Sequence, residues 1–174
     1  MEKRTNEVMF KGNPVTLVGP RVKPGDKAPD FRVLNSGLGT VTLADTTKKA
    51  RLFSVVPSLD TPVCSTQTKK FEDAIKALGD KVACYTVSLD LPFAQKRFCS
   101  EAGCSAMQTL SDVHNHSFGM NWGTLIEGLP LPLEARSVFV VDKNGTVTHA
   151  EYVKEVTTEP NYDAALAALR AAAA

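Results

Sequence analysis

The feature that most constrains this chain is an alternation of apolar runs with amphipathic stretches through its middle. Residues 50–56 and 82–89 are nearly continuous apolar runs, which is typical of strands buried on both faces. Residues 62–78 between them carry apolar side chains at helical spacing, and a second helix is predicted from about residue 91 to 103. A short third strand is predicted at residues 107–111. Strands that alternate with helices in this way predict an α/β fold.

Antiparallel elements are predicted on either side of this central region. Three pairs of β-prone runs are separated by turn residues: 8–10 with 15–18, 31–34 with 41–43, and 137–141 with 146–152. The last pair is joined by a turn with Asn144-Gly145, a strong hairpin signal because Asn-Gly accepts positive φ angles. Residues 19–30 predict an extended loop, 115–122 a helical turn and 161–172 a terminal helix. The expected fold is a mixed sheet flanked by helices on both faces, a three-layer α/β arrangement.

Length and composition predict one domain over residues 1–174, because 43% hydrophobic residues are enough for one sizeable core. The chain balances 20 basic against 19 acidic residues, which gives no indication of a nucleic-acid or membrane-surface partner. Its N-terminus is polar and it has no apolar run of signal or membrane-span length, so a soluble cytoplasmic protein is expected. In a reducing compartment, any pair among the four cysteines that oxidises would indicate redox function.

The position of Cys64 carries most of the functional information. Thr61 suits the N-cap of the predicted helix and Pro62 suits its first position, which places Cys64 in the first helical turn. Backbone N–H groups without partners and the helix dipole favour the thiolate there, and the thiolate is the nucleophilic form of cysteine. Alternatively, Cys64 is a small buried hydrophobe, as free cysteines commonly are. Composition and spacing leave both interpretations open.

Longer motifs resemble those of the peroxiredoxins. Pro57-x-x-x-Thr61-x-x-Cys64 is similar to the signature of that family. Three segments are similar to its thiol peroxidase branch, whose members form an intramolecular disulfide: Val22-x-x-Gly25-Asp26-x-Ala28-Pro29-x-Phe31, Ser88-Leu89-Asp90-Leu91-Pro92-Phe93-Ala94-Gln95-x-Arg97-Phe98-Cys99, and Thr157-Thr158-Glu159-Pro160-Asn161-Tyr162. The resemblance runs across nearly the whole chain in order. It implies a thioredoxin-like fold with an N-terminal β-hairpin extension, reduction of hydrogen peroxide and organic hydroperoxides, and usually a homodimer.

The resemblance also implies roles for residues around the thiol. Cys64 would be the peroxidatic cysteine, which attacks the peroxide and becomes a sulfenic acid. Thr61 would hydrogen-bond the thiolate and the peroxide oxygen, and Pro57 would keep water from the pocket. Their simpler roles, a plain N-cap for Thr61 and a strand terminator for Pro57, are compatible with the same positions.

An arginine from a distant strand completes the family's site, and Arg136 occupies the matching position. Its guanidinium would stabilise the thiolate and polarise the O–O bond. Without the resemblance, Arg136 would be interpreted as a solvated residue at a strand edge. Arg51 and Arg97 are rivals that do not lie at the matching position.

Cys99 matches the resolving position of this branch, where a second thiol condenses with the sulfenic acid. A disulfide needs Cα atoms within about 7 Å, yet Cys64 and Cys99 lie on separate predicted helices, so local unwinding is expected in each turnover. Thioredoxin is the reductant that the resemblance implies. Cys84 lies in a buried strand pattern and is interpreted as an inert core thiol. Cys104 is either a competing resolving thiol or an idle surface cysteine, and the second interpretation is preferred.

Three other functions are compatible with parts of the sequence. A structural zinc site could use Cys99, Cys104, His114 and His116. The spacings are loose, however, and no Cys-x-x-Cys accompanies them, which also disfavours an enzyme that shuffles protein disulfides. A peroxide-responsive redox sensor could use Cys64 and Cys99 in the same chemistry but would leave bulk peroxide unconsumed. The sequence has no recognisable phosphate-binding loop, flavin signature or haem motif, so neither a cofactor nor a metal is expected.

Overall fold

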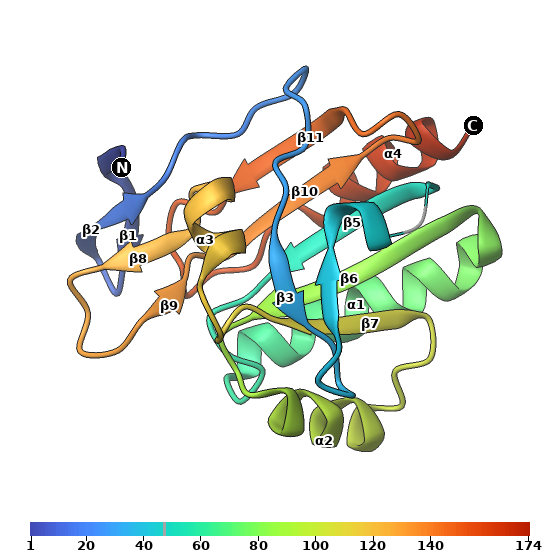
Figure 1. Ribbon diagram of the computed structural model, residues 1–174, viewed down its shortest axis with the longest axis horizontal. Helices are drawn as coiled ribbons and strands as arrows, with labels where there is room; N and C mark the ends of the chain where they lie inside the picture. The colour runs from blue at the N-terminus through green and yellow to red at the C-terminus, as the bar shows by residue number, and fades with distance from the viewer. Residues whose placement is uncertain (47) are drawn as a thin grey trace.

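The computed structural model describes residues 1–46 and 48–174 (Figure 1). Its strands are β1 (Lys3–Phe10), β2 (Asn13–Val18), β3 (Arg32–Leu34), β4 (Thr40–Thr42), β5 (Ala50–Val55), β6 (Val82–Ser88), β7 (Met107–Ser111), β8 (Leu125–Glu127), β9 (Leu133–Glu134), β10 (Ser137–Val141) and β11 (Val147–Tyr152). Its helices are α1 (Pro62–Leu78), α2 (Pro92–Ala102), α3 (Ser117–Trp122) and α4 (Tyr162–Ala173), with short 3-10 turns at Leu43–Asp45 and Gly79–Lys81.

The larger sheet has the strand order β11-β10-β5-β6-β7-β3-β4. Strands β5, β6 and β7 run parallel, because α1 and α2 carry the chain back between them. The remaining strands of this sheet pair antiparallel, β10 beside β5 and β3 beside β7. The mixed α/β sheet predicted from the apolar runs is therefore confirmed.

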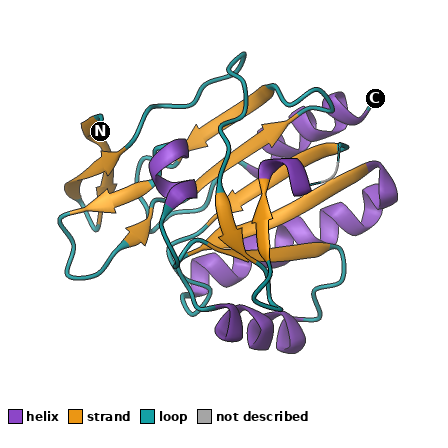
Figure 2. Cartoon of the chain, in the orientation of Figure 1, coloured by secondary structure: helices purple, strands orange, loops and turns teal. Residues whose placement is uncertain are grey.

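Two apolar cores lie on opposite faces of this sheet. Figure 2 shows the long helices α1 and α4 on one face and the short helix α3 on the other. On one face, α1 packs against β6 and β7 and α4 packs against β5 and β10, with Phe71 and Leu169 fully buried. On the other face, α3 contributes Phe118 and Trp122, whose stacked rings lie 4.9 Å apart and pack around Phe53. The long helices thus cover mainly one face, while α3 and the N-terminal region cover the other.

The N-terminal hairpin is part of a second sheet, with the order β1-β2-β8-β9. Strand β8 pairs antiparallel with β2, with Leu17 opposite Ile126, and β9 pairs with β8. The sequence predicts the hairpin, but no pattern in it indicates β8 or β9. These strands have three and two residues and are separated by a proline-containing loop, so they are too short to show a periodic pattern.

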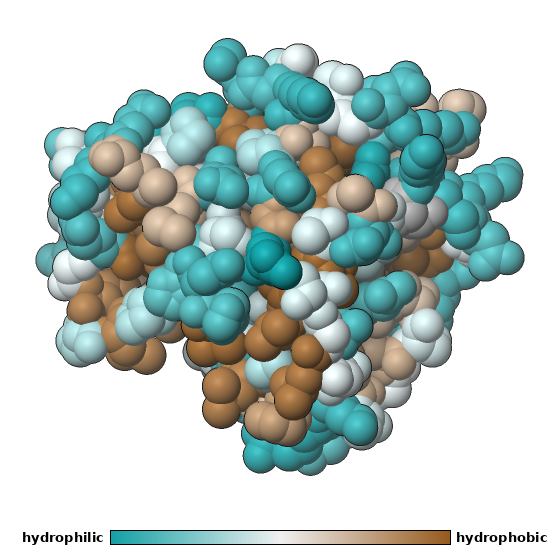
Figure 3. Space-filling model, in the orientation of Figure 1, coloured by the Kyte–Doolittle hydropathy of each residue, from teal (hydrophilic) through white to brown (hydrophobic). Residues whose placement is uncertain are grey.

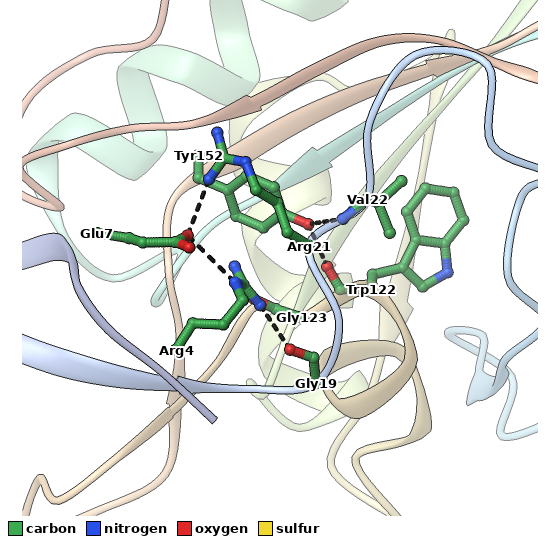
Figure 4. Close-up of polar contacts among 8 residues, drawn as sticks. All are labelled: Arg4, Glu7, Gly19, Arg21, Val22, Trp122, Gly123 and Tyr152. Atoms are coloured by element: carbon green, nitrogen blue, oxygen red, sulfur yellow. Dashed lines mark hydrogen bonds and ion pairs between the residues drawn. The ribbon is translucent and has the colours of Figure 1, made fainter. Parts of the chain in front are cut away.

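A cluster around Tyr152 fastens the N-terminal strands to the main sheet (Figure 4). The guanidinium carbons of Arg4 and Arg21 lie 4.9 and 5.0 Å from the centre of the Tyr152 ring. Glu7 pairs with both arginines, at 3.1 Å to Arg4 and 2.8 Å to Arg21. The Tyr152 hydroxyl donates to the Trp122 carbonyl at 2.7 Å. This cluster ties β1 and the loop after β2 to β11, while the Gly12 N–H at the hairpin tip donates to Glu155 Oε1 at 2.8 Å.

The turn between β10 and β11 differs in detail from the prediction. Gly145 has a positive φ of 84°, while Asn144 does not, and the register shifts between Val140 and Val141. The Asp142 side chain accepts hydrogen bonds from the backbone N–H groups of Asn144 and Thr146. The carboxylate therefore shapes the turn together with the glycine. Among the described residues, no helix has both the length and the apolar character needed to cross a membrane.

Candidate active site

Cys64 lies where the turn after strand β5 enters helix α1. Thr61 is the N-cap residue with an extended backbone, and Pro62 occupies the start of the helix, as predicted. The Thr61 hydroxyl does not cap the helix, however, and donates to the Ser58 carbonyl at 2.9 Å. Cys64 is fully buried and packs with Val56 and Leu59 beneath Phe98 of α2. The helix start therefore presents a sulfur that is screened from bulk water.

Arg136 brings a cation to this sulfur from the segment between β9 and β10. Its Nη2 atom donates to the Cys64 Sγ atom at 3.3 Å. Two further hydrogen bonds orient the guanidinium, from Nη1 to Gln67 Oε1 at 2.9 Å and from Nε to the Val156 carbonyl at 2.8 Å. Arg136 is only 2% exposed, so its charge acts on the sulfur with little screening. A guanidinium that donates to the sulfur can stabilise negative charge that develops there.

Gln67 is a site residue that sequence analysis missed. It is fully buried on α1, one turn after Cys64, and its Nε2 atom donates to Ser54 Oγ at 2.8 Å. The amide thereby links β5 to the arginine, and its oxygen faces the guanidinium. A polar side chain one helical turn from Cys64 on the buried face was the signal in the sequence that could have revealed it.

A cavity of about 340 Å³ is lined by Arg136, the residue that contacts the Cys64 sulfur, although Cys64 itself does not line it. Pro57, Thr61 and Arg136 line it, so the structure brings together three of the residues expected to surround Cys64. Its other lining residues are mostly apolar: Phe10, Lys11, Pro62, Val63, Val156 and Thr157. Phe10 and Lys11 come from the tip of the N-terminal hairpin, which sequence analysis did not place near the site. The hairpin therefore forms one wall of the cavity.

Asp90 fixes the loop that leads to Cys64. Its carboxylate accepts from Ser58 Oγ and from the Leu59 backbone N–H, both at 2.8 Å. Arg97 of α2 forms an exposed ion pair with Asp60 of the same loop at 3.3 Å. Arg51, the other rival of Arg136, is buried and bonds to the Thr46 hydroxyl and the Asp142 carbonyl. Both rivals thus have partners away from the sulfur.

Cys99 lies on helix α2 and faces away from Cys64. Phe98 is the residue that packs over Cys64, whereas Cys99 lines a separate cavity of about 280 Å³ that also contains Cys104. Burial, the neighbouring Cys104 thiol and the Glu72 carboxylate raise the pKa of Cys99 to about 12. In this conformation Cys99 is a weak nucleophile, because little of it is thiolate at neutral pH.

The remaining candidate ligands do not assemble into a metal site. Cys84 is 1% exposed in β6, and burial raises the pKa of its thiol above the ordinary range, as suits an inert core residue. Within residues 1–46 and 48–174, no group of three or more His, Cys, Asp or Glu side chains is placed to hold a metal ion. Cys99 and Cys104 lie together, but the structure does not gather His114 and His116 with them.

Comparisons with known proteins identify the family of this chain. The Redoxin family model matches residues 23–166. The thiol peroxidase of Halalkalibacterium halodurans is 53% identical over 165 residues, which cover 95% of this chain and 98% of the relative. The thiol peroxidase of Bacillus subtilis is 51% identical over 165 residues, with 95% and 97% coverage. The chain belongs to the thiol peroxidases of the peroxiredoxin family.

Solved structures show that this thiol peroxidase has the peroxiredoxin form of the thioredoxin-like fold. A peroxiredoxin-like protein from Aquifex aeolicus superposes with a TM-score of 0.88 at 42% identity, covering 97% of each chain. A thiol peroxidase from Chromobacterium violaceum superposes with a TM-score of 0.84 at 17% identity, covering 94% of this chain and 95% of its own, and shares the fold. The family resemblance, the fold class and the peroxidase activity expected from the sequence are thereby confirmed.

Proposed function

We propose that this thiol peroxidase reduces hydrogen peroxide and organic hydroperoxides through a Cys64 thiolate and recovers through a disulfide with Cys99. The observation that supports it best is the 3.3 Å hydrogen bond from Arg136 Nη2 to Cys64 Sγ beside the 340 Å³ cavity. This cavity has room for a substrate next to the arginine that contacts the sulfur. Its mostly apolar walls suit the carbon chain of an organic hydroperoxide as well as the small hydrogen peroxide.

The first step is nucleophilic attack on the O–O bond. The Cys64 thiolate bonds to one peroxide oxygen, the O–O bond breaks, and the departing oxygen takes a proton to leave as water or an alcohol. Arg136 stabilises the thiolate and then the negative charge that develops on the departing oxygen. The Thr61 hydroxyl lines the same cavity and can bond the peroxide oxygen, and Pro57 keeps bulk water from the sulfur. Cys64 ends the step as a sulfenic acid.

The second step needs movement, because Cys64 is buried beneath Phe98 while Cys99 lines another cavity. The Cys99 thiol condenses with the sulfenic acid, a disulfide forms and water leaves. The bonds from Asp90 to Ser58 and Leu59 and the Asp60–Arg97 ion pair hold the two helix regions in the reduced arrangement. These contacts are the ones expected to break when the helices open locally.

The reductant and the cellular compartment are proposed from the family resemblance, and the oligomeric state from the resemblance and from exposed apolar side chains. Thioredoxin is proposed as the dithiol reductant, with residues 1–174 acting as a single cytoplasmic domain. A homodimer is proposed because apolar side chains remain exposed on α2 and the β8–β9 loop, among them Phe93 at 65% and Leu131 at 56%. Figure 3 shows hydrophobic residues gathered along the lower margin of the molecule, over the start of α2 and this loop.

Peroxide consumption coupled to a thioredoxin system tests the proposal. Wild-type protein should turn over continuously, Cys64→Ser should remove no peroxide, and Cys99→Ser should stop after its first turnover with thioredoxin. Full activity in Cys64→Ser would contradict the assignment of the nucleophile. A wild-type protein that becomes oxidised without removing bulk peroxide would instead indicate a redox sensor.

A further inference from the structure

Cys99 and Cys104 are brought together by the way helix α2 ends. Gly103 follows the helix with a left-handed backbone, φ 73° and ψ 35°, and its N–H donates to the Cys99 carbonyl. The Cys104 N–H donates to the same carbonyl at 3.0 Å. This is a Schellman ending, in which side chains at the positions of Cys99 and Cys104 commonly meet. The backbone of the helix ending in Cys-x-x-x-Gly-Cys therefore brings the two thiols together.

The backbone geometry satisfies the distance requirement for a disulfide between these two cysteines. The 3.0 Å hydrogen bond and the standard bond lengths at its two ends limit the separation of the Cys99 and Cys104 Cα atoms to about 7 Å. Both side chains line the same 280 Å³ cavity and are partly exposed. Burial and the neighbouring Cys104 thiol both raise the pKa of Cys99. Lys96 also lines this cavity.

We propose that Cys104 is a third redox residue, which takes over the disulfide from Cys64 and leaves a Cys99–Cys104 bridge for the reductant. The proposal rests on the peroxidase cycle described above. The Cys104 thiolate attacks the Cys99 sulfur of the Cys64–Cys99 disulfide, the S–S bond to Cys64 breaks, and Cys64 leaves as a thiolate. No net oxidation occurs in this exchange. A dithiol protein then reduces the Cys99–Cys104 bridge and becomes a disulfide itself.

The direction of this exchange depends on how stable the Cys64 sulfur is as a leaving anion when the Cys64–Cys99 disulfide is attacked. The better leaving group is the sulfur whose anion is more stable, and the Arg136 contact stabilises the Cys64 anion. The Cys64–Cys99 bridge requires at least one helix to open, whereas the folded ending of α2 already holds Cys99 beside Cys104. Transfer of the bridge to Cys104 therefore lets both helices refold. It also moves the oxidised pair from beneath Phe98 to a cavity that a partner protein can reach.

Peroxide stoichiometry without reductant tests this proposal. Wild-type protein should take up a second equivalent of peroxide, because the exchange regenerates the Cys64 thiolate, and Cys104→Ser should stop after the first equivalent. Cys84→Ala is the matched control, since it removes a buried thiol from β6, and it should behave like the wild type. Acid-quenched, alkylated samples mapped by peptide mass should show Cys64–Cys99 early and Cys99–Cys104 later in the wild-type protein.

The outcomes separate the two proposals. A wild-type protein that stops at one equivalent and retains only Cys64–Cys99 would overturn the exchange while leaving the peroxidase mechanism intact. A Cys64–Cys104 bridge would also overturn it, because Cys104 would then resolve the sulfenic acid directly. Failure of folded wild-type protein to consume even the first equivalent would instead overturn the peroxidase mechanism.

Discussion

At the scale of single residues, Arg136 connects the parts of the site. Its three donors reach the Cys64 sulfur, the Gln67 side chain and the Val156 carbonyl. A planar guanidinium can satisfy all three at fixed angles, whereas a lysine ammonium acts as a point charge on a flexible stem. The site therefore depends on the shape of this cation as well as on its charge.

Arg136→Lys should lower kcat/KM for peroxide by about tenfold to a hundredfold, because a hydrogen bond involving a charged group contributes about 1.5–3 kcal/mol. Steady-state kinetics with a thioredoxin system would measure the loss. Arg97→Lys is the matched control, since its ion pair with Asp60 is exposed and contributes about 0–1 kcal/mol. Equal activities of the two variants would contradict the role given to Arg136.

The buried carboxyl group of Glu134 should make the stability of the protein depend on pH. Burial and the nearby Asp112 carboxylate raise the pKa of Glu134 well above 4.5. At a pH between 4.5 and the raised pKa of the folded state, the Glu134 carboxyl group has lost its proton in the unfolded chain but keeps it in the folded protein. The free energy of unfolding should therefore fall as the pH rises above about 4.5, and this loss should disappear in Glu134→Gln.

Denaturant unfolding of both proteins across this pH range would measure the effect of Glu134. The stability of the wild type relative to Glu134→Gln should decrease as the pH rises. Glu101→Gln is the control, because it changes an exposed carboxylate on α2. The difference in the free energy of unfolding between the wild type and Glu101→Gln should stay constant over the same pH range. A constant difference for Glu134→Gln would mean that its carboxyl group titrates alike in the folded and unfolded states.

At the scale of elements, the two ends of helix α2 have different tasks. Its N-terminal half contributes Arg97, which bonds to the loop before Cys64, and its C-terminal ending presents Cys99 and Cys104. The left-handed backbone at Gly103 makes this ending possible. No atom lies within 4 Å of a Cβ built at Gly103, so a side chain there meets only conformational strain.

Gly103→Ala should lower the free energy of unfolding by about 1 kcal/mol, because a side chain disfavours the left-handed conformation. Thermal or urea unfolding would measure the change. Gly37→Ala is the control, since its backbone is not left-handed and its built Cβ meets only Asn35 Oδ1 at 3.5 Å. A loss in Gly103→Ala no larger than in Gly37→Ala would argue against a strained ending.

Helix opening gives the second prediction at this scale. Cys104→Ser should hold the oxidised protein in its Cys64–Cys99 form, so amide hydrogen exchange around both cysteines should be faster than in the reduced form. Exchange in α4 should be the same in both forms, because α4 packs on β5 and β10 away from the bridge. Equal protection around Cys64 and Cys99 in the two redox forms would show that the disulfide forms without opening.

At the scale of the whole molecule, the site draws on distant parts of the chain. Helix α1 supplies Cys64 and Gln67, the segment between β9 and β10 supplies Arg136, and the tip of the N-terminal hairpin supplies Phe10 and Lys11. The Tyr152 cluster in Figure 4 secures the N-terminal strands whose tip forms the cavity wall. The hairpin extension therefore belongs to the site as much as to the fold.

The sequence predicts the parts of this arrangement that local patterns encode. Apolar runs identify β5 and β6, and Thr61-Pro62 marks the start of α1. Resemblance to the family, and not any local pattern, points to Arg136, because its approach to Cys64 depends on how β10 pairs with β5. Strands β8 and β9 are too short for a pattern. The cavity wall at Phe10 depends on long-range packing that no local signal reports.

The central claim is that Arg136 holds Cys64 as a thiolate, and the ultraviolet absorbance of the thiolate as a function of pH tests it most directly. A Cys99→Ser/Cys104→Ser protein leaves only Cys64 and the deeply buried Cys84, and further replacement of Cys64 by serine supplies the blank. The thiolate band should be present at neutral pH with Arg136 and absent in Arg136→Gln. A band that appears at the same pH with and without Arg136 would contradict the account.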